Sequence, residues 1–415
     1  MKYILVILIV ALVLKDTSQL NDPYIMRGGA EFLCLLSGTA WLVSNINGDL
    51  VKKYWPVFGY FSVLIISMLF SKNIIYIMIQ ILSLFAVVIF AISYFERNAI
   101  RNYDQTLFVN TTVYMYFIAC LLSLLIIPLL PSQAFDVLYG GEVRFRGLFS
   151  KSGMMASAAG ILFGFALYGY KPKSKYFKYI AVLIGLACVA LTLSRTFWLA
   201  LIFASGITVY FYYPKLKKYA VMAILMSVVI VVGVMSIGVK YDTKSAEKLA
   251  RVDSITSLSG RLELWETSIN SLSGYRWVLG YGFTAGSEGL GIKTVMSSRE
   301  TGKTTLHNGY VQSLLDSGVL GFFFYVLIII LSLKNIIKRD FLKKYAYICY
   351  TIVFLSIANI GEAVIYTASI YHSIVFWFVA IFALSLPKKR IEDSIEVPVN
   401  DNRSSSSYSS VRLRV

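Results

Sequence analysis

Apolar residues gather in long blocks along this chain, and short polar segments separate one block from the next. Twelve blocks can be counted, and most have about 16–24 residues, the length at which a helix crosses the hydrocarbon core of a bilayer. They lie near residues 3–14, 29–45, 54–70, 73–94, 107–130, 153–170, 177–193, 195–213, 219–238, 308–333, 345–366 and 370–386. This pattern predicts an all-α integral membrane protein with about twelve transmembrane helices.

The first block is short and follows Lys2, which is typical of a secretory signal peptide. The residues that end it, Leu14, Lys15 and Asp16, do not provide the small side chains of a cleavage site. We therefore expect a retained anchor helix at 3–14.

Composition excludes an ordinary soluble enzyme, because 57% of the residues are hydrophobic and the mean hydropathy is +0.69. A net charge of +17 would suit a nucleic-acid partner, but the cations are spread over connecting loops rather than gathered in one patch. We expect no nucleic-acid partner. The four cysteines lie far apart inside apolar blocks, so we expect them to be buried apolar residues rather than disulfides or metal ligands.

Loop charge predicts the orientation of the spans. If the N-terminus is cytoplasmic, the short outer loops carry about a third as many Lys and Arg residues as the inner ones. Twelve spans then place both termini in the cytoplasm. The loop at 239–306 falls outside, and a loop of that length can cross the membrane whatever its charge.

The chain therefore divides into five predicted parts. These are an N-terminal five-helix membrane part (1–130), central membrane helices with basic outer loops (131–238), one large outer loop (239–306), C-terminal membrane helices (307–390) and a Ser-rich cytoplasmic tail without fixed structure (391–415).

A base and a group of cations are predicted at the outer face. His307 lies where the large loop enters a span, and its side chain can take and return a proton near neutral pH. Arg144, Arg146, Arg195 and Arg261 lie at the same face, where topology disfavours cations. This combination predicts transfer chemistry on a lipid-linked anion.

Further polar residues accompany this group. Glu362 lies near the outer end of a predicted span, where a carboxylate is a functional candidate, most simply as the partner of an outer arginine. His372, near the same face, is expected to be structural. Within the large loop, Arg261–Leu272 has the apolar spacing of an amphipathic helix lying on the bundle or on the bilayer surface. The glycines that follow, from 274 to 291, indicate a mobile lid or acceptor-binding loop. Small residues at 153–160 indicate close helix packing.

Five short segments occur in order between residues 140 and 330. They are RFRGLFS (144–150), LTLSRTFWLA (191–200), SGRLELW (259–265), VLGYGF (278–283) and HNGYVQSLLDSGVLG (307–321). Together they resemble the signatures of the O-antigen polymerase and O-antigen ligase superfamily. The first five spans are similar to this family only in being hydrophobic, and the tail is not similar at all.

The resemblance implies a location and an activity. Such proteins act at the periplasmic face of the bacterial inner membrane, so the large outer loop would be periplasmic, and their fold resembles that of the C-class membrane glycosyltransferases. They move glycan from an undecaprenyl diphosphate carrier onto a sugar hydroxyl, with neither a nucleotide sugar nor a metal. Carried over by motif, the implied functional residues are Arg195, Arg261 and His307, with Arg146 as a further candidate.

The same chemistry can be argued from the residue types. A leaving diphosphate needs its developing charge stabilised, and guanidinium groups can do this as bidentate donors. We expect Arg195 and Arg261 to form the clamp, with Arg146 or Arg144 as a third charge. His307 would be the general base, and Asn308 would orient the acceptor sugar or the imidazole. We find neither an Asp-x-Asp pair nor a cluster with metal-ligand spacing, and we expect no metal and no cofactor.

Several functions remain open at this point. A polymerase would use a second lipid-linked glycan as acceptor and a ligase would use lipid A–core, and these motifs do not separate them. We favour a polymerase because residues 307–321 look more like those of exopolysaccharide and capsule polymerases. A chain-length regulator protein is a candidate partner. A lipid-linked oligosaccharide flippase is a remote alternative, since it would need cations along a central path and two repeated halves. A structural membrane protein would leave the outer cations unexplained.

Overall fold

The structure is a computed structural model of the chain. It describes residues 1–17, 24–99, 105–137, 143–170, 175–226, 262, 264–286, 306–337, 345–365 and 371–386. Met1–Ser385 form one compact unit, and Leu386–Val415 form a second unit of which only residue 386 is described.

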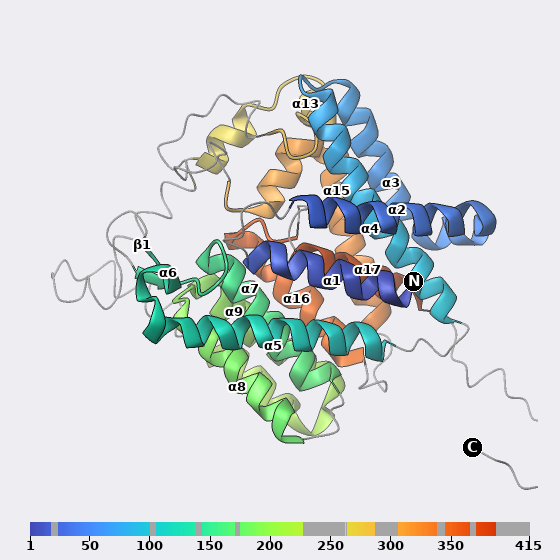
Figure 1. Cartoon of the computed structure of the whole chain (residues 1–415). Helices are drawn as coiled ribbons and strands as arrows, with labels where there is room; N and C mark the ends of the chain where they lie inside the picture. Colours follow the sequence, from blue (N-terminus) through green and yellow to red (C-terminus); the bar gives the residue numbers. More distant parts are fainter. Residues whose placement is uncertain are drawn as a thin grey trace, which may run out of the picture. The chain divides into compact units, whose positions relative to one another are not determined.

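The described residues fold into helices that follow the predicted apolar blocks (Figure 1). In chain order these are α1 (Lys2–Thr17), α2 (Tyr24–Asn45), α3 (Gly48–Leu69), α4 (Ile74–Ala99), α5 (Thr106–Leu129), α6 (Pro131–Ala134), α7 (Ser152–Gly164), the π-helix η1 (Phe165–Gly169), α8 (Lys175–Leu191), α9 (Arg195–Tyr212), the 3-10 helix η2 (Pro214–Leu216), α13 (Arg276–Leu279), α15 (Gly309–Ile337), α16 (Ala346–Gly361) and α17 (Tyr371–Ser385). Residues 217–226 and 264–270 are also helical. Helix is therefore present in every predicted block, and the all-helical class is confirmed.

Length and hydropathy identify membrane spans within the described ranges. Five helices there are long and apolar enough to cross a bilayer: Ile74–Arg97, Thr106–Leu129, Ser152–Gly169, Arg195–Tyr212 and Gly309–Ile337. Ala346–Gly361 and His372–Ser385 are shorter apolar helices. The total of twelve spans stays a prediction, as does the orientation of the termini.

Helix α15 lies at the centre of the packing that positions the candidate site. It contacts α3, α16 and α17, and α16 in turn packs along α9. Helix α7 packs between α8 and α16. The predicted close packing of α7 is confirmed, because side chains at Gly160 and Gly164 would overlap the rings of Phe354 and Tyr350.

Helix α15 is broken inside the predicted block. Gly318 has φ 64° and ψ −170°, a backbone conformation that is essentially restricted to glycine. The short helical piece before Gly318 contains the buried polar side chains of Gln312, Ser313 and Asp316. The apolar run of this block gave no sign of the break.

A two-stranded antiparallel ribbon, which the sequence did not predict, joins α6 to α7. It consists of β1 (Phe135–Val137) and β2 (Val143–Phe145), and Asp136 faces Arg144 across it. The intervening residues 138–142 lie outside the described part.

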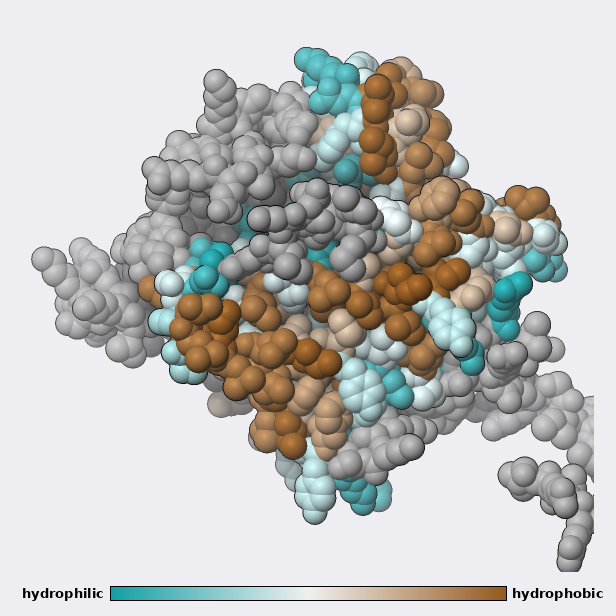
Figure 2. Space-filling model, in the orientation of Figure 1, coloured by the Kyte–Doolittle hydropathy of each residue, from teal (hydrophilic) through white to brown (hydrophobic). Residues whose placement is uncertain are grey.

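The outward surface of several helices is apolar, as Figure 2 shows for one face. On α5, for example, Ile118, Leu122 and Leu125 are exposed. Such surface suits a hydrocarbon environment rather than water. The four cysteines are fully buried and have no disulfide partners, which confirms their predicted role as small buried residues.

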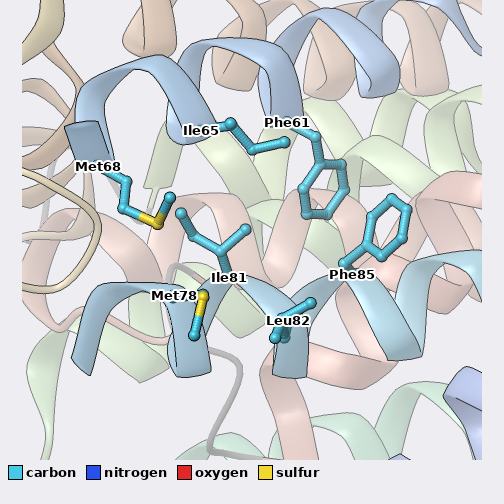
Figure 3. A pocket seen from close by; sticks show the side chains of 7 residues that line it. All are labelled: Phe61, Ile65, Met68, Met78, Ile81, Leu82 and Phe85. Carbon is cyan, nitrogen blue, oxygen red and sulfur yellow. The ribbon is translucent and has the colours of Figure 1, made fainter. Parts of the chain in front are cut away.

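A small apolar pocket of about 140 Å³ lies between α3 and α4 (Figure 3). Both helices contribute only apolar side chains to it: Phe61, Ile65 and Met68 from α3, and Met78, Ile81, Leu82 and Phe85 from α4. None of the predicted site residues lines this pocket.

Candidate functional site

His307 and Glu362 come together although 55 positions separate them in the sequence. His307 lies two residues before α15, and Glu362 directly follows α16. The Nδ1 atom of His307 is 3.0 Å from Oε2 of Glu362, and both side chains are part-exposed. Because an ionised carboxylate can only accept hydrogen bonds, this contact favours the proton on Nδ1. The Nε2 atom of a neutral His307 then carries the lone pair that can accept a proton.

The backbone of His307 is in the left-handed region, with φ at 49°. This conformation costs a non-glycine residue about 1–2 kcal/mol, so neighbouring contacts must hold it. One such contact follows directly in the chain, where Oδ1 of Asn308 accepts from the backbone N–H of Tyr310 at 2.9 Å and of Val311 at 3.2 Å. Asn308 therefore caps α15 immediately after His307. Its expected role in orienting the acceptor sugar or the imidazole stays a prediction.

Glu362 is fixed by the end of α16. Its N–H donates to the carbonyl of Ala358 at 3.0 Å, and its φ of −151° and ψ of 147° turn the chain out of the helix. A Cβ added at Gly153 would lie 3.5–3.8 Å from Cγ, Cδ and Oε1 of Glu362, so the carboxylate lies against the first turn of α7. A helix N-terminus favours a nearby negative charge. The sequence pointed to an arginine partner for Glu362, whereas the geometry adds His307 and the start of α7.

Arg195 lies at the same end of the bundle as His307 and Glu362. It is the exposed first residue of α9, and the next residue, Thr196, touches Gly361, the neighbour of Glu362. The first turn of a helix carries backbone N–H groups that attract anions, and a guanidinium adds a full positive charge. A phosphate group at this position would therefore meet charge and hydrogen-bond donors together.

Arg144 and Arg146 belong to the ribbon and the turn after it. Arg144 faces Asp136 in the ribbon register. Arg146 donates from Nε to the carbonyl of Gln133 at 3.0 Å and from its backbone N–H to the carbonyl of Ala134 at 2.9 Å. These bonds give Arg146 a local structural role, and its terminal amino groups are the donors that a diphosphate would use. Diphosphate binding by either residue stays a prediction.

Arg261, the other half of the expected clamp, lies outside the described residues. Of the amphipathic helix predicted at Arg261–Leu272, residues 264–270 are helical, and they pack on the bundle through Leu264. Nε1 of Trp265 donates to the carbonyl of Leu306 at 2.8 Å, at the residue before His307. The underlying apolar cluster consists of Leu272, Leu306 and Leu315, with Leu264, Tyr281, Val311 and Leu314 packed against it.

Asp316 is a fully buried carboxylate that the sequence analysis did not single out. Its Oδ1 accepts from the backbone N–H of Gly286 at 2.6 Å and from Nε2 of Gln312 at 2.9 Å, and its Oδ2 accepts from the N–H of Thr284 at 2.9 Å. Part of the glycine-rich stretch expected to be a mobile lid is thus fastened to α15. A signal existed, since Gln312 and Asp316 have the i, i+4 spacing of one helix face.

The described site combines a proton acceptor, a carboxylate that orients it and a cation at a helix start. This set can deprotonate a hydroxyl and bind an anion beside it. In the described ranges, no three His, Cys, Asp or Glu side chains come together as a metal site requires. The expectation about metals stays a prediction.

Comparison with known proteins bears on the segment that carries most of these residues. Residues 180–326 match the family model described as O-antigen ligase. A curated relative, an uncharacterized protein of Haemophilus influenzae, is 25% identical over 181 residues, which are 40% of this chain and 45% of the relative. The match thus covers less than half of that relative. Arg195, Arg261 and His307 all lie within 180–326. The resemblance of this segment to the O-antigen polymerase and ligase superfamily is therefore confirmed.

Proposed function

We propose that the chain is a membrane glycosyltransferase that transfers an undecaprenyl diphosphate-linked oligosaccharide onto a sugar hydroxyl at the periplasmic face of a bacterial inner membrane. The observation that carries the proposal is the 3.0 Å contact between His307 and Glu362 beside the first turn of α9. The family match at residues 180–326 supports the same class of reaction. Both chain termini would then be cytoplasmic.

His307 acts as the general base in this proposal. Glu362 accepts the Nδ1 proton and orients the ring, so that Nε2 takes the proton of the acceptor hydroxyl. The acceptor oxygen forms a bond to the anomeric carbon as the bond from that carbon to the diphosphate oxygen breaks. The electron pair leaves with undecaprenyl diphosphate, and a single displacement of this kind inverts the anomeric centre.

Arginine side chains stabilise the leaving diphosphate. Arg195 is the best supported of them, because the start of α9 adds backbone donors at the end of the bundle that carries His307. The sequence motif assigns Arg261 as the second arginine of the clamp, and Arg144 and Arg146 supply further positive charge. Fixed guanidinium groups can perform this task without a metal.

The acceptor separates two versions of this function. We favour a polymerase, whose acceptor is a second lipid-linked glycan, on the grounds of residues 307–321. The matching family is described as O-antigen ligase, which favours transfer to lipid A–core instead. The two reactions need the same base and the same cations.

The test is a gel of envelope glycans from a host strain in which the native gene is deleted. The strain is complemented with wild type, His307→Ala, Glu362→Gln or Glu266→Gln. The last variant is the matched control, because Glu266 is an exposed carboxylate of the helix at 264–270. Immunoblots of membranes verify equal expression.

A polymerase gives a ladder that wild type and Glu266→Gln restore, whereas His307→Ala leaves a single repeat. A ligase gives loss of decorated lipid A–core, with polymer retained on the carrier. Full restoration of glycans by His307→Ala in either setting would overturn the catalytic role of this residue.

A further inference from the structure

His307 is held between two anchored pieces of backbone. On its C-terminal side, Asn308 caps α15, and the backbone N–H of Gln312 donates to the carbonyl of Asn308 at 2.9 Å in the first helical turn. On its N-terminal side, the carbonyl of Leu306 accepts from the indole of Trp265 at 2.8 Å. Between these anchors the φ angle of His307 is 49°.

The indole donor is itself rigidly placed. The helix at 264–270 packs through Leu264 on the cluster that contains Leu306 and Leu315. The end of this helix is held by Tyr281, whose hydroxyl donates to the carbonyl of Ser271 at 3.0 Å. Tyr281 is bound in turn to α15, because its N–H donates to the carbonyl of Leu315 at 3.0 Å. The donor therefore sits on a support fixed to the same helix that His307 precedes.

The geometry of a peptide explains why this donor controls His307. The carbonyl of Leu306 and the N–H of His307 belong to one planar peptide group. The φ angle of His307 is the rotation about its N–Cα bond, which directly follows this peptide group. With α15 fixed on one side and the Leu306 carbonyl fixed on the other, that angle has little freedom.

We propose that Trp265 is a positioning residue, whose indole N–H holds His307 in the left-handed conformation that brings Nδ1 to Glu362. This inference rests on the proposed function, in which His307 is the base. It adds that a segment of the outer loop, rather than α15 alone, sets the direction of the imidazole. Without the Trp265 hydrogen bond, His307 relaxes toward a right-handed or extended backbone and its ring leaves Glu362.

The test uses the fact that the chain has only two histidines. Full-length protein labelled with ¹⁵N,¹³C-histidine in liposomes gives two imidazole spin systems in solid-state NMR. The spectrum of His307→Ala identifies the remaining one as His372, which is buried in α17 and serves as an internal reference for folding. The ¹⁵N shifts of His307 distinguish a ring protonated at Nδ1 from one protonated at Nε2.

Three variants are compared with wild type. Trp265→Phe removes the N–H, and replacement of Trp265 by benzothienylalanine removes it while keeping the size of the ring system. Trp277→Phe is the matched control, because Trp277 is an exposed tryptophan of α13, which follows the helix at 264–270 in the chain. Envelope glycans are measured in parallel for the two phenylalanine variants.

In both Trp265 variants we expect His307 to lose the Nδ1-protonated signature while the His372 signals stay unchanged. Glycan output of Trp265→Phe should fall at least tenfold, as expected when a base is no longer oriented. Should the Phe variant fail to fold, the benzothienylalanine variant decides. Unchanged His307 signals in the Trp265 variants, or an equal change in Trp277→Phe, would overturn the proposal. A different outcome would reject only the proposed function. In it, the His307 signals change in the Trp265 variants as expected, but His307→Ala gives wild-type glycan output.

Discussion

The Nδ1 atom of His307 lies 3.0 Å from Oε2 of Glu362, where the start of α15 meets the end of α16. A base paired with an orienting carboxylate is a common arrangement for activating a hydroxyl. This relationship makes Glu362 as testable as the histidine.

Replacing Glu362 by glutamine should lower transfer by about 10²-fold, since general-base catalysis is worth about 10²–10⁴-fold. A neutral amide can accept from Nδ1 or donate to it, so it no longer selects the Nδ1-protonated form of His307. Glycan formed per amount of membrane protein, in vesicles containing the native lipid-linked donor, measures the effect. Glu266→Gln, which changes an exposed carboxylate of the helix at 264–270, should match wild type. Equal activity of the two variants would remove Glu362 from the mechanism.

Replacing Arg195 by lysine should also impair transfer, although the positive charge is kept. A guanidinium offers a planar pair of donors to a diphosphate, and an ammonium does not. We expect a loss of roughly tenfold for Arg195→Lys and of about 10²–10³-fold for Arg195→Gln, the range found for a lost oxyanion donor. The same vesicle assay applies.

Arg97→Lys supplies the control for this prediction, since Arg97 is exposed in the last turn of α4. An Arg195→Lys variant as active as wild type would mean that charge alone suffices at this position.

The helices could be predicted from the sequence because most of the apolar blocks are as long as a bilayer crossing. Alternating the loops predicted that His307 and the four arginines lie at one face of the bundle. The structure brings Arg195 toward His307, because Thr196 lies against Gly361 and Glu362 contacts His307, whereas Arg261 lies outside the described residues. Long-range pairing could not be predicted in this way. Nothing in the local pattern around Glu362 names a histidine 55 positions earlier as its partner.

Breaks in the backbone also could not be predicted from the pattern of apolar blocks. The block at 308–333 suggested one continuous span, yet Gly318 breaks α15 with φ 64°. Asp316 could be linked to Gln312 by its i, i+4 spacing, but the sequence does not show that its other donors are the backbone N–H groups of residues 284 and 286. Hydrophobic periodicity does not report where a distant segment crosses a helix.

Gly318 offers a test of that crossing. An alanine there would place its Cβ against the backbone of Val278 and Leu279, and it would also have to adopt a conformation that is essentially restricted to glycine. Gly318→Ala should destabilise the fold by more than about 3 kcal/mol. Thermal unfolding of the purified protein in detergent gives the comparison.

The control is Gly274→Ala, because Gly274 also has a positive φ, at 55°, but nothing lies within 4 Å of an added Cβ. This substitution should cost about 1–2 kcal/mol, the conformational term alone. An equal loss of Tm for both variants would contradict the close contact between Gly318 of α15 and the backbone of Val278 and Leu279.

Asp316 should be needed to keep residues 284–286 on α15. Asp316→Ala leaves three donors without their acceptor, two of them in buried hydrogen bonds, and each buried donor costs about 1–3 kcal/mol unless water replaces the carboxylate. Asp316→Asn keeps one oxygen but turns an NH₂ group toward an N–H donor, so it should destabilise as well, by about 2 kcal/mol. Hydrogen exchange, measured by mass spectrometry, should then show lost protection at the backbone amides of Thr284 and Gly286, while the amides in the middle of α16 stay protected.

Asp49→Asn is the control, because Asp49 is exposed in the first turn of α3, and it should leave both regions protected. Retained protection at Thr284 and Gly286 in Asp316→Ala would show that the backbone bonds from Tyr281 and Gly282 to α15 hold the segment without the carboxylate.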